Sequence, residues 1–139
     1  NGMFKIGTQE ITSTSATLSG GSVTVSLDVG TSAQLASVTG AAGKTIFTDD
    51  AAKGSYVRIT QFETDDQLKI TGAKESDYSF ASGDLDNDGS ADDLWIVYNN
   101  TALGIENDIG ILNAISPSVF VFDKATAISA VGFSFISFG

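Results

Sequence analysis

An acidic segment spanning residues 84–93 has the residue types and spacing that point most directly to chemistry. It reads DLDNDGSADD, so carboxylates occupy positions 1, 3, 5, 9 and 10 and glycine occupies position 6. Alternating carboxylates can surround one Ca²⁺ ion, which takes roughly six to eight oxygen ligands. The glycine permits a sharp turn that brings the next carbonyl inward. The predicted metal ligands are Asp84, Asp86, Asp88, Ser90, Asp92 and Asp93.

The residues after this segment distinguish it from the loop of an EF-hand. Position 12 is Trp95 instead of a bidentate glutamate, and residues 94–98 have the pattern of a strand. We therefore expect a calcium loop between β-strands. Magnesium is a poorer fit because it prefers to keep its water ligands. The alternative is a solvated acidic turn, but five aspartates within ten residues repel one another without a cation.

The composition excludes several classes of function. The chain has 139 residues, 17 acidic and seven basic, with a net charge of −10 and neither histidine nor cysteine. This rules out Ser-His-Asp and Cys-His catalysis and the usual ligands of zinc, haem and iron–sulfur clusters. We expect no enzymatic activity. A net negative charge argues against nucleic acid as a partner, and no apolar run is long enough to predict membrane insertion.

Further acidic pairs leave a second metal site open. Each pair could complete a weaker calcium site, also across a subunit contact, or could form a solvated turn. The pairs are Asp49 and Asp50, Asp65 and Asp66, Glu75 and Asp77, and Glu106 and Asp108.

The hydrophobic pattern has a period of two, which predicts strands. Turn residues separate about ten short strands at the spacing of a sandwich or barrel. We expect an all-β fold, a single jelly-roll-like β-sandwich domain over residues 1–139, with a weak helix at 32–37. The expected strands are 3–6, 16–18, 23–29, 45–47, 56–59, 67–70, 78–80, 94–98, 109–112, 118–122 and 130–138.

The last two of these strands are apolar on both faces. A strand of that kind is central to a sandwich or is covered by a neighbouring subunit. Both interpretations remain open from the sequence.

Two stretches resemble known families. Residues 83–95, GDLDNDGSADDLW, are similar to the calcium loops of FG-GAP/VCBS-type extracellular repeats. Residues 59–115 resemble the C-terminal β-segment of RTX-type, type I-secreted bacterial proteins, although the glycine-rich nonapeptides that define those proteins, and with them a calcium β-roll, are absent. The resemblance implies an extracellular, calcium-dependent β-domain. The residues that carry it are Ile59, Phe62, Asp66, Leu68, Ile70, Gly72, Asp77 and Tyr78.

Three functions fit these observations. The first is an extracellular structural protein, a calcium-stabilised subunit that assembles with other copies of itself into a filament, sheath or surface layer. The second is a calcium-dependent adhesin that binds polysaccharide, with Trp95 and Tyr98 as a stacking platform beside the loop. The third is the C-terminal domain of a larger type I-secreted protein.

Overall fold

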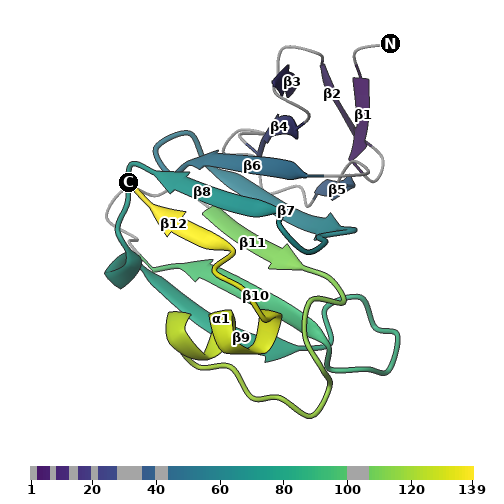
Figure 1. The fold of residues 1–139 in the computed structure, drawn as a ribbon, viewed down its shortest axis with the longest axis vertical. Coiled ribbons are helices and arrows are strands. Elements are labelled where there is room, and N and C mark those ends of the chain that lie inside the picture. The colour runs from purple at the N-terminus through teal and green to yellow at the C-terminus, as the bar shows by residue number, and fades with distance from the viewer. Residues whose placement is uncertain are drawn as a thin grey trace.

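The computed structural model describes residues 3–6, 9–12, 16–19, 22–27, 36–39, 44–99 and 107–139. Its described part is mostly β-structure, arranged as two sheets (Figure 1). The first sheet has seven strands in the order β2 (Gln9–Thr12), β1 (Met3–Ile6), β5 (Ala36–Thr39), β7 (Ser55–Thr60), β11 (Asn107–Ile111), β10 (Asp93–Tyr98) and β9 (Tyr78–Gly83). The second has five, in the order β12 (Ile136–Phe138), β8 (Gln67–Thr71), β6 (Thr45–Asp50), β4 (Ser22–Ser26) and β3 (Ala16–Ser19).

The middle of the chain alternates between the two sheets. β4, β6 and β8 are parallel neighbours in the five-stranded sheet, while β5 and β7 are parallel neighbours in the seven-stranded sheet. From β4 to β8, consecutive strands therefore alternate between the two sheets, and each sheet gains its strands in parallel. β11 then adds in parallel to β7, and β12 adds in parallel to β8.

This pairing differs from the expected jelly roll, which is built from antiparallel strands. The β-rich, two-sheet character is confirmed, but a jelly-roll sandwich is not. The alternating pattern of each strand shows only that one face is buried. It does not specify which strand lies beside it, so the pattern cannot distinguish parallel from antiparallel pairing.

The inner faces of the two sheets share one hydrophobic core. β6 and β7 alternate between buried and half-buried side chains, as a period of two predicts. Phe47 and Leu68 are fully buried on the five-stranded sheet, and Ile59 and Ile109 on the seven-stranded sheet.

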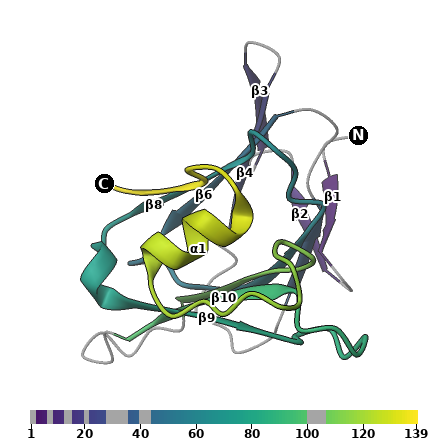
Figure 2. The ribbon, with the colours of Figure 1, turned by 60° about the horizontal axis from the view of Figure 1, so that its bottom comes forward.

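The C-terminal apolar segment contains a helix, where the sequence pattern predicts a strand over residues 130–138. α1 (Lys124–Val131) is capped at its N-terminus by Asp123, whose carboxylate accepts a hydrogen bond from the Thr126 amide, and at its C-terminus by Gly132 in the left-handed conformation. These capping groups outweigh the apolar pattern. Only β12 remains as a strand. α1 lies between the two sheets at their open end (Figure 2).

Residues 118–122 also differ from the prediction, because they form an unpaired connection instead of a strand. The Val121 amide donates a hydrogen bond to Ser82 Oγ, and Val121 is buried. Phe120 and Phe122 face outward. The weak helix expected at 32–37 is not present in its described residues, because Ala36 and Ser37 begin β5; residues 32–35 lie outside the described part.

No helix within the described ranges combines the length and the apolar character needed to cross a bilayer.

Candidate metal centre

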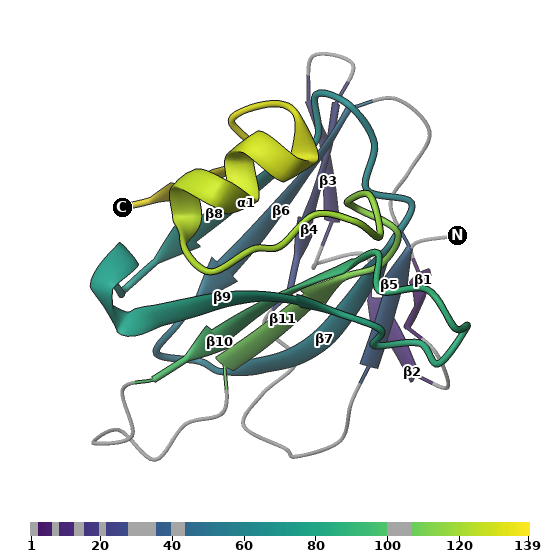
Figure 3. The same cartoon turned by 90° about the horizontal axis from the view of Figure 1, so that it is seen from below.

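The acidic segment connects β9 to β10 at the edge of the seven-stranded sheet, as Figure 3 shows from below. These two strands are antiparallel, and Asp93 is the register partner of Gly83. The loop therefore starts and ends at paired positions on the two neighbouring strands. The predicted position of the acidic segment between two β-strands is confirmed.

The loop folds around its own carboxylates. Asp84 accepts hydrogen bonds from the amides of Asp88, at 3.1 Å, and Gly89, at 3.0 Å. Asp88 accepts one from the Ser90 amide at 2.9 Å. Asn87 and Gly89 both have positive φ, at 59° and 89°. Asn87 was not singled out in the sequence, although asparagine tolerates this conformation better than most residues do.

Asp93 anchors the loop to the body of the sheet. This buried carboxylate accepts hydrogen bonds from the Leu85 amide at 2.6 Å and the Asp86 amide at 3.3 Å through one oxygen. Its other oxygen accepts from the Asn113 amide at 2.8 Å. The bonds join the start of the loop to the turn after β11. Asp93 thus anchors the loop to the sheet, which the sequence did not predict.

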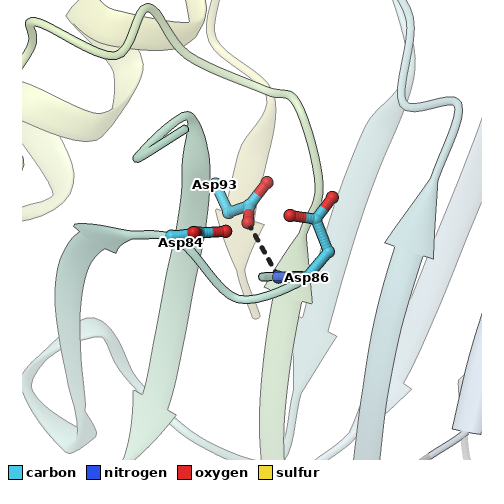
Figure 4. A group of neighbouring side chains, drawn as sticks. All are labelled: Asp84, Asp86 and Asp93. Carbon is cyan, nitrogen blue, oxygen red and sulfur yellow. Dashed lines mark hydrogen bonds between the residues drawn. The ribbon is translucent and has the colours of Figure 1, made fainter. Parts of the chain in front are cut away.

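Three of the predicted ligands come together. Asp84, Asp86 and Asp93 each offer a carboxylate oxygen within 4.8 Å of the other two, and the three face one another in Figure 4. Asp84 is exposed, Asp86 is half-buried and Asp93 is buried. Asp88 and Asp92 lie outside this group. The Ser90 carbonyl stays a predicted ligand.

The carboxylates of the loop perturb one another. Desolvation raises the pKa of Asp86 above its ordinary value, and the nearby carboxylates of Asp93, Asp84 and Asp88 raise it further, while a hydrogen bond from the Asp88 amide opposes them. The pKa of Asp92 is also raised, by desolvation and then by the charges of Asp88 and Asp93. Desolvation is the larger cause of both pKa shifts, and the surrounding negative charge adds to it.

The Asp92 carboxylate is only partly satisfied by hydrogen bonds. Its Oδ1 atom is buried and has no hydrogen-bond partner among the described residues. Buried carboxylate oxygens are normally satisfied by a donor or a cation. The main chain at the same residue is fixed, because the Asp92 carbonyl accepts a hydrogen bond from the Ile115 amide at 3.1 Å.

Leu85 fastens the loop to the outer face of the sheet. A Cβ atom added to Gly110 would lie 2.8 Å from Leu85 Cδ1, so the leucine occupies the space that a side chain on β11 would take. Neither residue was identified from the sequence. The signal that exists is the glycine within an otherwise apolar strand, which marks a close approach.

The predicted stacking platform of Trp95 and Tyr98 is wrong. Trp95 is 40% exposed on the outer face of β10, whereas Tyr98 is buried on the inner face and packs against Tyr78. Side chains three residues apart on a strand point to opposite faces.

The other acidic pairs do not gather into a second cluster of three among the residues that the structure places. Asp49 is buried and accepts a hydrogen bond from Ser55 Oγ at 2.8 Å, and Asp66 is buried and accepts two from backbone amides. The Asp77 carboxylate accepts from the Lys74 amide. Glu106 lies outside the described residues.

Comparison of the chain with protein-family models, with curated proteins and with solved structures gives no match. The functional argument therefore depends on the geometry of the molecule itself.

Proposed function

We propose that the loop of residues 84–93 binds one Ca²⁺ ion. The observation that carries this proposal is the convergence of Asp84, Asp86 and Asp93 within 4.8 Å of one another. The buried, unsatisfied Oδ1 of Asp92 supports it independently. Asp88, Asp92 and the Ser90 carbonyl would complete the oxygen shell after small movements of the loop.

Calcium fits this set of donors better than other common ions. The donors are oxygens only, which suits hard cations, and the chain has no histidine or cysteine to favour zinc or copper. The carboxylates come from an irregular loop that contains two residues of positive φ. Ca²⁺ accepts such irregular shells, whereas Mg²⁺ demands near-octahedral geometry and retains water.

Titration calorimetry with Ca²⁺ and with Mg²⁺ tests the site. We expect one saturable Ca²⁺ site and weaker Mg²⁺ binding. Asp86→Ala should weaken Ca²⁺ binding by about tenfold or more, because it removes a charged ligand. Asp65→Asn is the matched control, since Asp65 is exposed, lies outside the loop and has a positive φ of 76° that asparagine tolerates. Equal affinities in all three proteins would refute the assignment.

We further propose that the calcium-loaded domain serves as an extracellular structural subunit that assembles with copies of itself. Phe120 and Phe122 support this, because they are 74% and 62% exposed and their ring centroids lie 5.9 Å apart. Paired exposed aromatics favour a protein contact. Calcium would lower the negative charge that opposes close packing of copies.

Electron microscopy and light scattering, with calcium and with excess EGTA, test the assembly. We expect ordered filaments or sheets that require calcium, and their loss in a Phe120→Ser, Phe122→Ser double variant that keeps the wild-type melting temperature. Isolated particles at high protein concentration in both conditions would overturn the structural role while leaving the calcium site intact.

The path of the chain is compatible with a further proposal, that the domain belongs to an RTX-like secreted protein. The parallel pairing of alternate strands from β4 to β8 supports it, although the chain lacks the nonapeptide repeats. Recovery of a much longer intact precursor from the native source would support this origin, and a short precursor would exclude it.

A further inference from the structure

A buried polar cluster lies between the two sheets, at the end of β11 opposite to the acidic loop. Ser55 is the first residue of β7 and Asn107 the first of β11, and the two are register partners in the seven-stranded sheet. Asp49 of β6 reaches them from the five-stranded sheet. The exposed fractions of Ser55, Asn107 and Asp49 are 0%, 0% and 1%. A hydroxyl, a carboxamide and a carboxylate therefore meet where the core excludes water.

The Asp49 carboxylate contacts both of the other groups. Its Oδ1 accepts a hydrogen bond from Ser55 Oγ at 2.8 Å, and its Oδ2 accepts one from Asn107 Nδ2 at 2.8 Å. Ser55 Oγ also lies 3.0 Å from Asn107 Oδ1. Because a carbonyl bond is about 1.23 Å long, the hydroxyl oxygen lies within about 4.2 Å of the carboxamide carbon Cγ. One carboxylate thus joins a hydroxyl to the nitrogen of the carboxamide beside it.

This arrangement has the parts that an acyl transfer needs. A serine hydroxyl becomes a nucleophile when an adjacent base takes its proton, and the base must lie within hydrogen-bond reach. Asp49 Oδ1 meets that condition, and as the charged and nearer acceptor it competes better for the proton than Asn107 Oδ1 does. Holding the reacting groups in contact lowers the barrier, and the exclusion of water protects the product from hydrolysis.

We propose that Ser55 and Asn107 react with each other to form an intramolecular ester cross-link. Ser55 Oγ forms a bond to Asn107 Cγ, and the bond between Cγ and Nδ2 breaks. Asp49 takes the hydroxyl proton and gives it to the departing nitrogen, which lies against the same carboxylate. Ammonia leaves, Asp49 returns to its starting form, and no oxidant or reductant takes part.

Tyr78 is a positioning residue in this reaction. Asn107 Nδ2 donates a hydrogen bond to the Tyr78 hydroxyl oxygen as well as to Asp49, and these two bonds fix the plane of the carboxamide with its carbonyl oxygen toward Ser55. Burial, followed by the charge of Asp49, raises the pKa of Tyr78 above its ordinary value of 10.0. The phenol therefore keeps its proton at neutral pH, which leaves Asp49 as the base.

The cross-link would join two neighbouring strands whose linked residues are 52 positions apart in the sequence. The chain has no cysteine, so disulfides cannot supply such a constraint. A covalent link of this span stabilises the folded state mainly by restricting the unfolded chain. The inference goes beyond the proposed calcium site and does not depend on it.

Intact-mass spectrometry of the denatured protein tests the cross-link. We expect the main species to be lighter than the sequence mass by about 17 Da, the mass of the ammonia that is lost. A digest should contain one peptide that joins Ser55 to Asn107, and alkaline hydroxylamine, which opens esters, should separate it into two. Ser55→Ala and Asp49→Asn should each show the full mass expected for the variant.

The matched control is a second serine and asparagine pair on the same chain. Ser79 Oγ accepts a hydrogen bond from Asn99 Nδ2 at 2.6 Å, but this pair is exposed. Ser79→Ala should therefore keep the loss of about 17 Da.

The wild-type protein decides the question even where a variant fails to fold. The full sequence mass in the wild type would overturn the cross-link. A loss that persists in Ser55→Ala would also overturn it, because ring closure at another asparagine then releases the ammonia. A loss that persists in Asp49→Asn would overturn the role of Asp49 as the base.

Discussion

Two acidic turns in this molecule differ in how hydrogen bonds satisfy their carboxylates. At the turn between β7 and β8, Asp66 is fully buried, and its two oxygens accept hydrogen bonds at 2.8 Å from the amides of Thr45 and Glu63. In the loop between β9 and β10, the carboxylates of Asp84, Asp86 and Asp93 converge on one another.

The difference lies in how many carboxylates share the available donors. The Asp66 carboxylate accepts a hydrogen bond from an amide at each oxygen, so it needs no ion. These two bonds join the start of β6 to the turn before β8. Several carboxylates in one loop use their amides to shape the backbone and still leave acceptor oxygens facing one another. The first arrangement stabilises the fold by itself, whereas the second, under the proposal made here, does so once a cation is bound.

The largest expected effect is on the buried turn. Asp66→Ala should lower the free energy of unfolding by about 2–4 kcal/mol, because it leaves two amides without an acceptor. Urea denaturation with calcium and with EGTA measures this loss, which should be the same in both conditions. Asp65→Asn is the neighbouring control and should change little, since Asp65 is exposed. A loss that depends on calcium would remove the distinction between the two turns.

Substitutions in the loop should behave differently. Asp84→Ala and Asp86→Ala should each weaken calcium binding by about tenfold or more, which is roughly 1.4 kcal/mol of stability at saturating calcium. Asp88→Ala should have a smaller effect, because its carboxylate lies outside the converged group. Calorimetry and thermal melts in parallel give both quantities. Equal effects of all three variants would show that the ion draws the loop into a different arrangement.

Gly110→Ala tests whether the loop depends on its contact with the sheet. The new methyl group would lie 2.8 Å from Leu85 Cδ1, so the leucine must move. We expect a loss of about 1 kcal/mol in stability and calcium binding that is weaker by a few-fold. Gly83→Ala is the matched control at the end of β9, where a Cβ atom has open space. Unchanged calcium affinity in Gly110→Ala would show that the loop does not depend on this contact.

The smallest effect concerns an exposed carboxylate with its own donors. The Thr126 amide, followed by its hydroxyl, lowers the pKa of Asp123 below the ordinary value of 3.8. A lowered pKa means that Asp123 stabilises α1 above its unfolded pKa, and that this contribution is lost as the pH falls through the folded value. Asp123→Ala should therefore lower the melting temperature by a few degrees at neutral pH.

The difference between wild type and Asp123→Ala should shrink as the pH falls below about 4. Melting curves of both proteins across this range measure it. A difference that stays constant with pH would mean that the charge of the cap contributes nothing.

Residue spacing predicted the position of the acidic loop and most strands before α1, because alternation and turn residues are local signals. It did not predict the parallel pairing of alternate strands, since the order of strands depends on contacts between distant residues. Of the strand predicted over residues 130–138 only β12 is present, because the capping pair of Asp123 and Thr126 starts a helix that extends into the first residues of that range. The anchoring of Leu85 over Gly110 depends on register across three strands, so the glycine indicates a close approach without showing which residue makes it.

A thermal melt of the wild type and of Asp86→Ala, each with saturating calcium and with EGTA, tests the central claim most directly. The calcium loop predicts that EGTA lowers the melting temperature of the wild type and leaves that of Asp86→Ala almost unchanged, because only the intact loop holds the ion in the folded state. A wild-type melting temperature that is indifferent to EGTA, or a shift of equal size in both proteins, would contradict it.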